Sequence, residues 1–169
     1  LERVIAALPA RAFLVIDEAY HEYALGAGPE VDYAQAMRLR ADAPRMIILR
    51  TFSKLYGLAG LRVGYGIGAA RVIDYVDRLR RAFNVGALAQ IAATAALDDV
   101  EHARRAVEVA QTSIARMRSE LAGPGLTVYP SLANFVLIDV GRPSQPVYEA
   151  LLARGVITRP MAGWGLPHH

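Results

Sequence analysis

Two short apolar runs, each ending abruptly in polar residues, constrain the fold of this chain more than any other feature. The first run, Ala12–Ile16, leads directly into Asp17–Tyr20, and the second, Arg45–Arg50, leads into Thr51–Lys54. Continuous apolar runs of this length predict strands that are buried on both faces of a parallel sheet. Open α/β sheets bind ligands at the carboxyl ends of such strands, so both polar clusters are expected at one ligand-binding edge.

The rest of the chain alternates between helical and extended patterns. Apolar residues at helical spacing predict helices over residues 1–8, 32–40, 71–81, 87–97, 98–121 and 145–154. Further strands are expected over residues 61–68, 126–129, 134–140 and 156–159. This order predicts an α/β protein in two parts. Residues 1–97 would form the first part, with a mostly parallel sheet flanked by helices, and residues 98–169 a long helix followed by a second, small α/β layer.

Glycines occupy alternate positions, Gly64, Gly66 and Gly68, in the strand expected over residues 61–68. Side chains alternate between the two faces of a strand, so one face of this strand carries no side chains. A neighbouring group is therefore expected to pack closely on it.

Composition excludes several classes of function. The net charge of +3 is too small to indicate a nucleic-acid partner, and the densest arginine cluster, within residues 78–81, is mixed with Asp74 and Asp77. Without cysteine, disulfides and thiolate chemistry are excluded. No apolar run approaches the roughly 20 residues of a membrane span, so no membrane partner is expected.

Lys54 is the only lysine among the 19 lysine and arginine residues. A cation used only for its charge can be arginine, as elsewhere in this chain. An amine nucleophile cannot, because guanidinium stays protonated whereas lysine can lose its proton in a suitable site. Lys54 is therefore the candidate nucleophile, with a solvated surface cation as the alternative.

The two strand ends together offer the side chains that a flat, anionic, carbonyl-bearing cofactor requires. Lysine can condense with an aldehyde, a buried carboxylate can hold a ring nitrogen protonated, and hydroxyls with an arginine can hold a phosphate. This combination describes pyridoxal 5'-phosphate. The residues that would supply it are Asp17, Tyr20, Thr51, Ser53, Lys54 and Arg62.

These motifs resemble a known family. Asp17–Tyr20 followed by Thr51–Arg62 is similar to the fold-type I aminotransferases of the class I/II superfamily, and most closely to the histidinol-phosphate aminotransferases. The similarity continues through Ala133–Phe135 and Arg154–Pro160. The resemblance implies that this chain corresponds to part of the large domain and part of the small domain of such an enzyme, roughly its second half.

The resemblance also implies roles for single residues. Lys54 would form the Schiff base with the cofactor, Asp17 would pair with the pyridine nitrogen, and Tyr20 would pair with the ring hydroxyl. The phosphate would be held by Ser53 and Arg62, with Thr51 as a further candidate. Arg159 matches a family arginine close to the anionic groups of the substrate.

Each assignment has a structural alternative. Asp17 could cap the turn that follows its strand. Tyr20 could be a core tyrosine, and Arg62 could pair with a surface carboxylate. Arg159 rests on a short local motif.

For the protein to which this stretch belongs, the resemblance implies transamination of histidinol phosphate, with glutamate and 2-oxoglutarate as the second substrate pair. It also implies a homodimer, and a cytoplasmic location is expected. An aromatic aminotransferase or a phosphothreonine decarboxylase would use the same cofactor residues. Family elements that precede and follow this stretch are absent from it, so the chain alone is expected to be inactive. A non-catalytic fragment that associates through exposed sheet edges is the alternative from another class.

Overall fold

The computed structural model describes residues 1–28, 36–39, 44–123 and 125–169. The chain divides into two compact units, Leu1–Val107 and Glu108–His169, and each is described by itself. The predicted domains, residues 1–97 and 98–169, stay a prediction. Part of the helix expected over residues 32–40 lies outside the described residues; the helix α3 (Ala36–Leu39) falls within its bounds.

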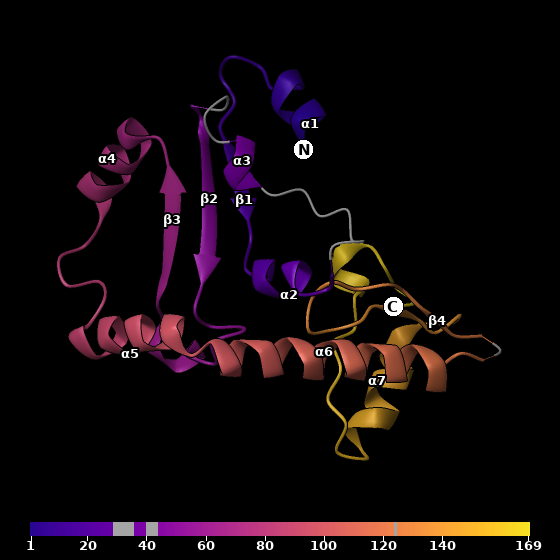
Figure 1. Ribbon diagram of the computed structural model, residues 1–169. Helices are drawn as coiled ribbons and strands as arrows, with labels where there is room; N and C mark the ends of the chain where they lie inside the picture. The colour runs from indigo at the N-terminus through magenta and orange to yellow at the C-terminus, as the bar shows by residue number, and fades with distance from the viewer. Residues whose placement is uncertain (29–35, 40–43, 124) are drawn as a thin grey trace. The chain divides into compact units, whose positions relative to one another are not determined.

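The first unit is built on a three-stranded sheet with the order β1-β2-β3. Strand β1 (Leu14–Asp17) pairs in parallel with β2 (Met46–Thr51), which confirms the two apolar runs as neighbouring parallel strands. Strand β3 (Gly64–Gly68) pairs with β2 in the antiparallel sense. Figure 1 shows the three strands side by side, with β1 and β2 pointing the same way and β3 the opposite way.

One face of this sheet carries the core. Met46 and Ile48 are buried against Ala36, and the helices α1 (Glu2–Ala7) and α3 contribute to the apolar residues around them. Ile16, Ile48 and Ile67 lie next to one another across the three strands by register. Burying these branched side chains on a pleated surface favours strand over helix here.

The opposite face of β1 is open, which corrects the expectation of a strand buried on both sides. Phe13 is 47% exposed, Val15 is 55% exposed, and Leu49 on β2 is 39% exposed. In this apolar run the exposed Phe13 and Val15 alternate with the partly buried Leu14 and Ile16, so only one side of the run is covered. Among the described residues, helices α1 and α3 cover only the other face.

The alternating glycines of β3 allow a close approach, as expected, and the approaching group is strand β2. A Cβ atom on Gly64 would lie 2.6 Å from the Arg50 carbonyl oxygen, and one on Gly68 would lie 3.1 Å from that of Met46. Any larger side chain would force these two strands apart.

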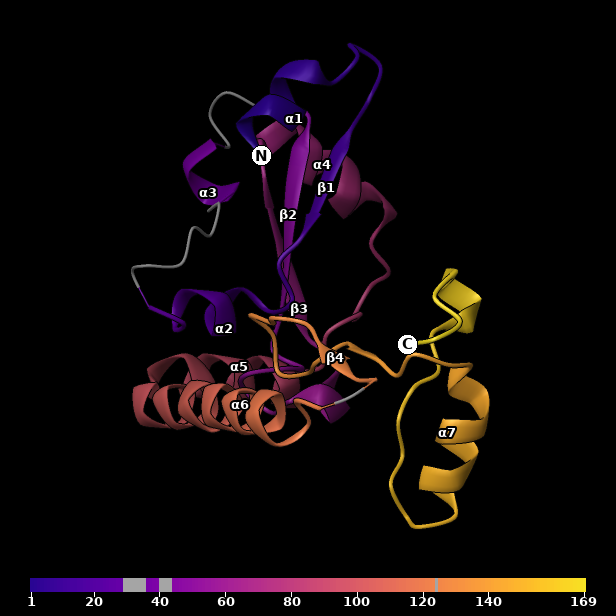
Figure 2. The same ribbon diagram turned by 90° about the vertical axis from the view of Figure 1, so that its right-hand side faces the viewer.

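Helices surround the ends of the sheet. They are α2 (His21–Leu25), α4 (Ala70–Leu79), α5 (Ala87–Asp98) and the first part, residues 100–107, of α6 (Val100–Glu120). Figure 2 shows α4 and α5 at opposite ends of the strands. A second apolar cluster joins Phe52 and Val63 to Ala89 and Ala93 of α5, and thus anchors the segment that carries Lys54. An acidic side chain caps the long helix, since Asp99 accepts a hydrogen bond from the His102 amide at 2.9 Å.

The second unit contains the rest of α6, the antiparallel pair β4 (Thr127–Val128) and β5 (Ile138–Asp139), and helix α7 (Ser144–Leu152). The strand predicted over residues 156–159 is wrong: this described segment is not a strand. The Val156 amide instead donates to the Leu151 carbonyl at the end of α7. Ile157 is 80% exposed, so no neighbouring strand buries its apolar side chain.

Two features are absent from the described residues. None of their helices combines the length and apolar character needed to cross a membrane. Their acidic and histidine side chains form no group that could hold a metal ion.

Candidate functional site

The candidate site of the first unit lies where β1 and β2 end. Asp17 is the last residue of β1 and Thr51 is the last residue of β2. Tyr20 follows in the turn that leads into α2, and Ser53 and Lys54 follow in the loop after β2. Because the two strands are parallel, both polar clusters reach the same edge of the sheet, as the sequence predicts.

Lys54 lies against the predicted cofactor residue of the other strand. Its Nζ atom is 5.2 Å from the centroid of the Tyr20 ring, within the range of a cation–π contact. The Lys54 carbonyl accepts a hydrogen bond from the Gly57 amide, and Leu55 next to it is buried. The Leu55 carbonyl lies 3.0 Å from Nε2 of His102. The backbone on either side of the amine is thus held in place, while Lys54 itself is exposed.

Arg62, Ser53 and Thr51 form a connected group in the same loop. The Arg62 guanidinium donates to Ser53 Oγ at 3.4 Å and to the Ala59 carbonyl at 2.8 Å. The Ser53 amide donates in turn to Thr51 Oγ1 at 3.1 Å. Arg62 therefore contacts a hydroxyl of the predicted site, and none of the contacts found for it among the described residues is with a surface carboxylate.

The backbone of Arg62 adopts φ 51° and ψ 50°, in the left-handed region that disfavours a residue with a Cβ atom. Arg62 follows the short 3₁₀ helix η2 (Ala59–Leu61), and a glycine at this position would fit without strain. This strained backbone makes Arg62 a candidate functional residue of the loop.

Asp17 makes the local contact that its structural alternative predicts. Its Oδ1 atom accepts a hydrogen bond from the Ala19 amide at 3.0 Å and so stabilises the turn after β1. One carboxylate oxygen is used in this way, which orients the carboxylate relative to the strand end. Capping the turn and binding a ligand are thus compatible roles for this aspartate, and its pairing with a cofactor stays a prediction.

Arg159 belongs to the second unit, where it is exposed in the segment after α7. Its predicted contact with substrate stays a prediction.

Two further groups at the strand ends have shifted pKa values. Burial is the main cause that raises the pKa of Glu22, on α2, and burial together with the nearby Glu22 carboxylate raises the pKa of Tyr56. The Tyr56 phenol, packed on Phe52 at 5.1 Å between ring centroids, therefore stays protonated at neutral pH.

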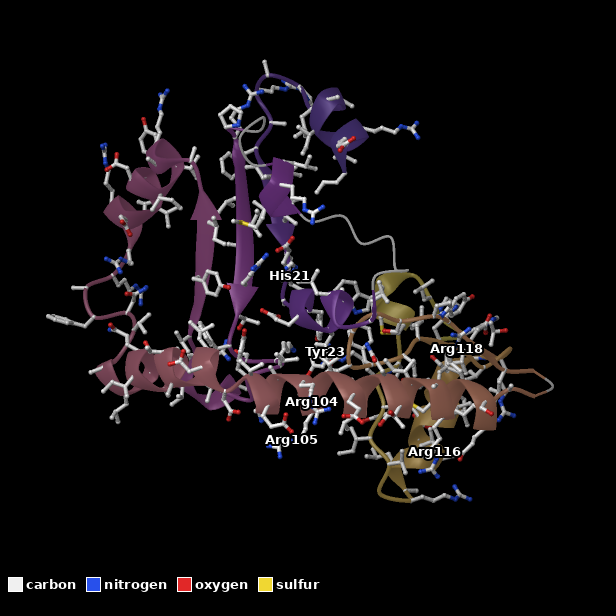
Figure 3. The ribbon with its side chains drawn as sticks, viewed as in Figure 1. His21, Tyr23, Arg104, Arg105, Arg116 and Arg118 are labelled. Atoms are coloured by element: carbon white, nitrogen blue, oxygen red, sulfur yellow. The ribbon has the colours of Figure 1, made fainter. Side chains whose placement is uncertain are left out.

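A buried charged cluster next to the site was missed by the sequence analysis. Glu18 and His21 are 4% and 6% exposed, and Arg50 on β2 donates to Glu18 from Nε at 2.9 Å and from Nη2 at 2.8 Å. Figure 3 shows His21 at the start of α2, close to the strand ends. The available signal was position: Glu18 follows Asp17, and Arg50 precedes Thr51.

The sequence profile of a family described as aminotransferase class I and II matches residues 1–169, the whole of the chain. This chain belongs to the class I and II aminotransferase family. The match is consistent with the lysine loop, the acidic strand end and the α/β sheet described above.

The similar aminotransferases carry a consistent description. The chain is 46% identical, over its full length, to histidinol-phosphate aminotransferase 1 from Nitrosococcus oceani, and covers 45% of that protein. It is 46% identical over 162 residues to histidinol-phosphate aminotransferase 3 from Rhizobium meliloti, with 95% of the chain and 43% of that protein covered. The chain thus spans a little under half the length of these relatives.

A solved aminotransferase structure has the same fold. The histidinol-phosphate aminotransferase from Sinorhizobium meliloti, in complex with pyridoxal-5'-phosphate, superimposes with a TM-score of 0.81 at 34% identity. The match covers 94% of this chain and 44% of that chain. The predicted fold class, part of a fold-type I aminotransferase, is thereby confirmed.

Proposed function

We propose that the protein to which these residues belong is a pyridoxal-phosphate-dependent aminotransferase that acts on histidinol phosphate with 2-oxoglutarate and glutamate. The observation that carries the proposal is the position of the Lys54 amine, 5.2 Å from the Tyr20 ring, at the common end of β1 and β2. The description shared by the relatives supports the choice of substrate.

The side chains present fit the cofactor. A phosphate needs several donors, and the Arg62 guanidinium with the Ser53 hydroxyl, 3.4 Å apart, offers two on one side. An aldehyde needs an amine, and Lys54 is the only lysine of the chain. When bound, pyridoxal phosphate supplies that aldehyde and a ring that withdraws the electron pair left when a substrate Cα–H bond breaks.

Each residue then has a specific task. Lys54 would hold the cofactor through its amine and, once released, would bind and release the transferred proton at Nζ. The Asp17 carboxylate would hold a proton on the pyridine nitrogen of the bound cofactor. Tyr20 would donate toward the ring hydroxyl, and Arg62 with Ser53 and Thr51 would hold the phosphate.

The proposal extends to partners and compartment. Arg159 would bind an anionic group of the substrate. The protein would be a homodimer in the cytoplasm, as the family resemblance implies. The first unit has exposed apolar side chains, including Phe83 at 98% and Leu79 at 87%, which a partner subunit would cover.

An activity assay of the whole protein tests the proposal. Purified protein reconstituted with pyridoxal phosphate should convert 2-oxoglutarate to glutamate with histidinol phosphate as donor. It should do so with a kcat/KM at least about tenfold higher than with phenylalanine. Efficient transfer from phenylalanine alone would assign the protein to the aromatic enzymes, and phosphothreonine decarboxylation without amino transfer would assign it to the decarboxylases.

A binding measurement separates cofactor from substrate. One pyridoxal phosphate per chain should bind with a visible absorption band. If no band forms and no amino transfer occurs with any donor, the proposal is wrong.

A further inference from the structure

The buried pair between Glu18 and Arg50 connects the two strand ends that carry the candidate site. Both donor atoms of Arg50 reach the same oxygen, Oε2 of Glu18, at 2.9 and 2.8 Å. The side chain of Glu18 is 3% exposed and that of Arg50 is 15% exposed. His21 Nδ1 lies 3.4 Å from the same oxygen. Oε2 of Glu18, the residue that follows β1, therefore contacts side chains of both β2 and α2.

The backbone of Glu18 is held equally firmly. Its amide donates to the Leu49 carbonyl at 2.8 Å, and its carbonyl accepts from the His21 amide at 3.0 Å. The second carboxylate oxygen, Oε1, accepts from the amide of Ala36 on α3 at 3.4 Å. Glu18 thus joins four segments of the first unit through its main chain and side chain.

Strand alternation places this pair opposite the candidate cofactor residues. Successive side chains of a strand point to opposite faces, so Arg50 and Thr51 lie on different faces of β2. Asp17 is paired with Leu49, two positions before Thr51, and therefore shares a face with Thr51. Glu18 turns to the face of Arg50. The ion pair therefore lies on one face of the sheet, and Asp17 and Thr51 lie on the opposite face at the same edge.

The charges of this cluster are matched. Burial alone would lower the pKa of Arg50, but its hydrogen bond to Glu18 and the nearby Tyr65 phenol raise it above its ordinary value. Burial and the Arg50 charge lower the pKa of His21, and Glu18 opposes them. At neutral pH His21 is therefore uncharged, and Arg50 is the cationic partner of Glu18.

We propose that the Glu18–Arg50 pair is a positioning device for the cofactor site: it fixes the spacing between Asp17–Tyr20 on β1 and Thr51–Lys54 on β2. This inference rests on the proposed function, because the spacing matters only if one ligand bridges both strand ends. A misplacement of about 1 Å at such a site costs up to about a hundredfold in rate.

A pair that only stabilises the fold makes a different prediction. A buried ion pair replaced by apolar residues of similar volume often leaves a protein equally or more stable. If stability were the only role, the double variant Glu18→Leu/Arg50→Met would bind cofactor and react as the unsubstituted protein does. A positioning role predicts that stability is retained while cofactor geometry is not.

The experiment measures both properties in the whole protein with pyridoxal phosphate. The thermal unfolding midpoint of the double variant is expected to lie within a few degrees of that of the unsubstituted protein. Its cofactor dissociation constant should rise about tenfold or more, and kcat at saturating cofactor should fall about tenfold to a hundredfold. The visible circular dichroism of the bound cofactor, which reports its fixed orientation, should fall by about half or more. Unchanged circular dichroism and kcat in the folded double variant would overturn the proposal.

A conservative variant covers a failure of the double variant to fold. Arg50→Lys keeps the charge but lacks the second nitrogen and the planar guanidinium that contact Glu18, so it should give a smaller change in the same direction, about threefold to tenfold in kcat. Parent-like kcat and circular dichroism in Arg50→Lys would overturn the proposal.

Two controls complete the design. Arg116→Gln/Glu120→Gln removes an exposed ion pair of 2.7 Å on α6 and should leave all readouts unchanged. Lys54→Ala separates this inference from the proposed function. If Lys54→Ala keeps parental activity, the proposed function fails. If Lys54→Ala is inactive while the Glu18 and Arg50 variants match the parent, only the positioning role fails.

Discussion

At the scale of single residues, Arg62 combines an unfavourable backbone with a side chain directed at Ser53. The left-handed conformation costs a residue with a Cβ atom about 1 kcal/mol, and glycine avoids that cost. Arg62→Gly and Arg62→Ala should both weaken binding of pyridoxal phosphate by about 10- to 100-fold, because both remove a charged donor.

The two Arg62 variants should differ in stability. Arg62→Gly is expected to exceed Arg62→Ala by about 1 kcal/mol in the free energy of unfolding, measured by urea denaturation. Parental cofactor affinity in both variants would show that Arg62 does not hold the phosphate.

His21 predicts a pH dependence of stability. Burial lowers its pKa below 6.5, so the unfolded chain binds a proton in a pH range where the folded chain does not. The contribution of His21 to the free energy of unfolding is fully present above pH about 6.5 and is lost as the pH falls through the lowered pKa. His21→Gln should remove this part of the loss, seen as a smaller difference in urea midpoint between pH 7.5 and pH 5. Identical pH dependence in parent and variant would contradict the assignment.

At the scale of elements, the glycines of β3 set the distance to β2. A Cβ atom at position 64 would meet the Arg50 carbonyl at 2.6 Å, whereas one at position 60 meets no atom within 4 Å. Gly64→Ala should therefore destabilise the protein by about 1–3 kcal/mol, and the control Gly60→Ala should stay within about 0.5 kcal/mol. Thermal unfolding of the two variants compares them, and equal midpoints would contradict the close approach.

The elements that the sequence predicts well are those with a strong local pattern. Long helices such as α6 and the parallel pair β1 and β2 follow from apolar periodicity and run length. The strand expected over residues 156–159 is wrong because the β-branched run Val156–Thr158 has no neighbouring strand among the described residues. The direction of β3 was likewise not predicted, since pairing depends on contacts distant in sequence.

The candidate site was predictable to the same extent. Asp17, Lys54 and Arg62 stand in motifs, and Lys54 is the sole lysine, so sequence alone singles them out. Glu18 and Arg50 were missed because an acid and an arginine in polar runs have the composition of a solvated surface. Only the register of β1 against β2 brings Glu18 and Arg50 together, on the face of the sheet opposite Asp17 and Thr51.

At the scale of the whole molecule, the first unit leaves apolar surface uncovered. Phe13 and Val15 on β1 and Leu49 on β2 are each exposed, and the chain spans under half the length of its relatives. The 169-residue chain by itself is therefore expected to self-associate, as measured by light scattering across a concentration series.

A matched variant tests which surface is responsible. Val15→Thr keeps the branched shape that suits a strand but reduces apolar area, and should reduce the association. A monodisperse monomer that binds pyridoxal phosphate tightly would contradict this account of the exposed face.

The central claim is that Lys54 is the amine that bonds to the cofactor, and covalent mapping tests it most directly. The whole protein is loaded with pyridoxal phosphate, reduced with borohydride, digested and analysed by mass spectrometry. The account predicts one stoichiometric adduct, on the peptide that contains Lys54, and its loss in Lys54→Arg. An adduct on a different lysine of the loaded protein, at full stoichiometry and with Lys54 unmodified, would contradict it.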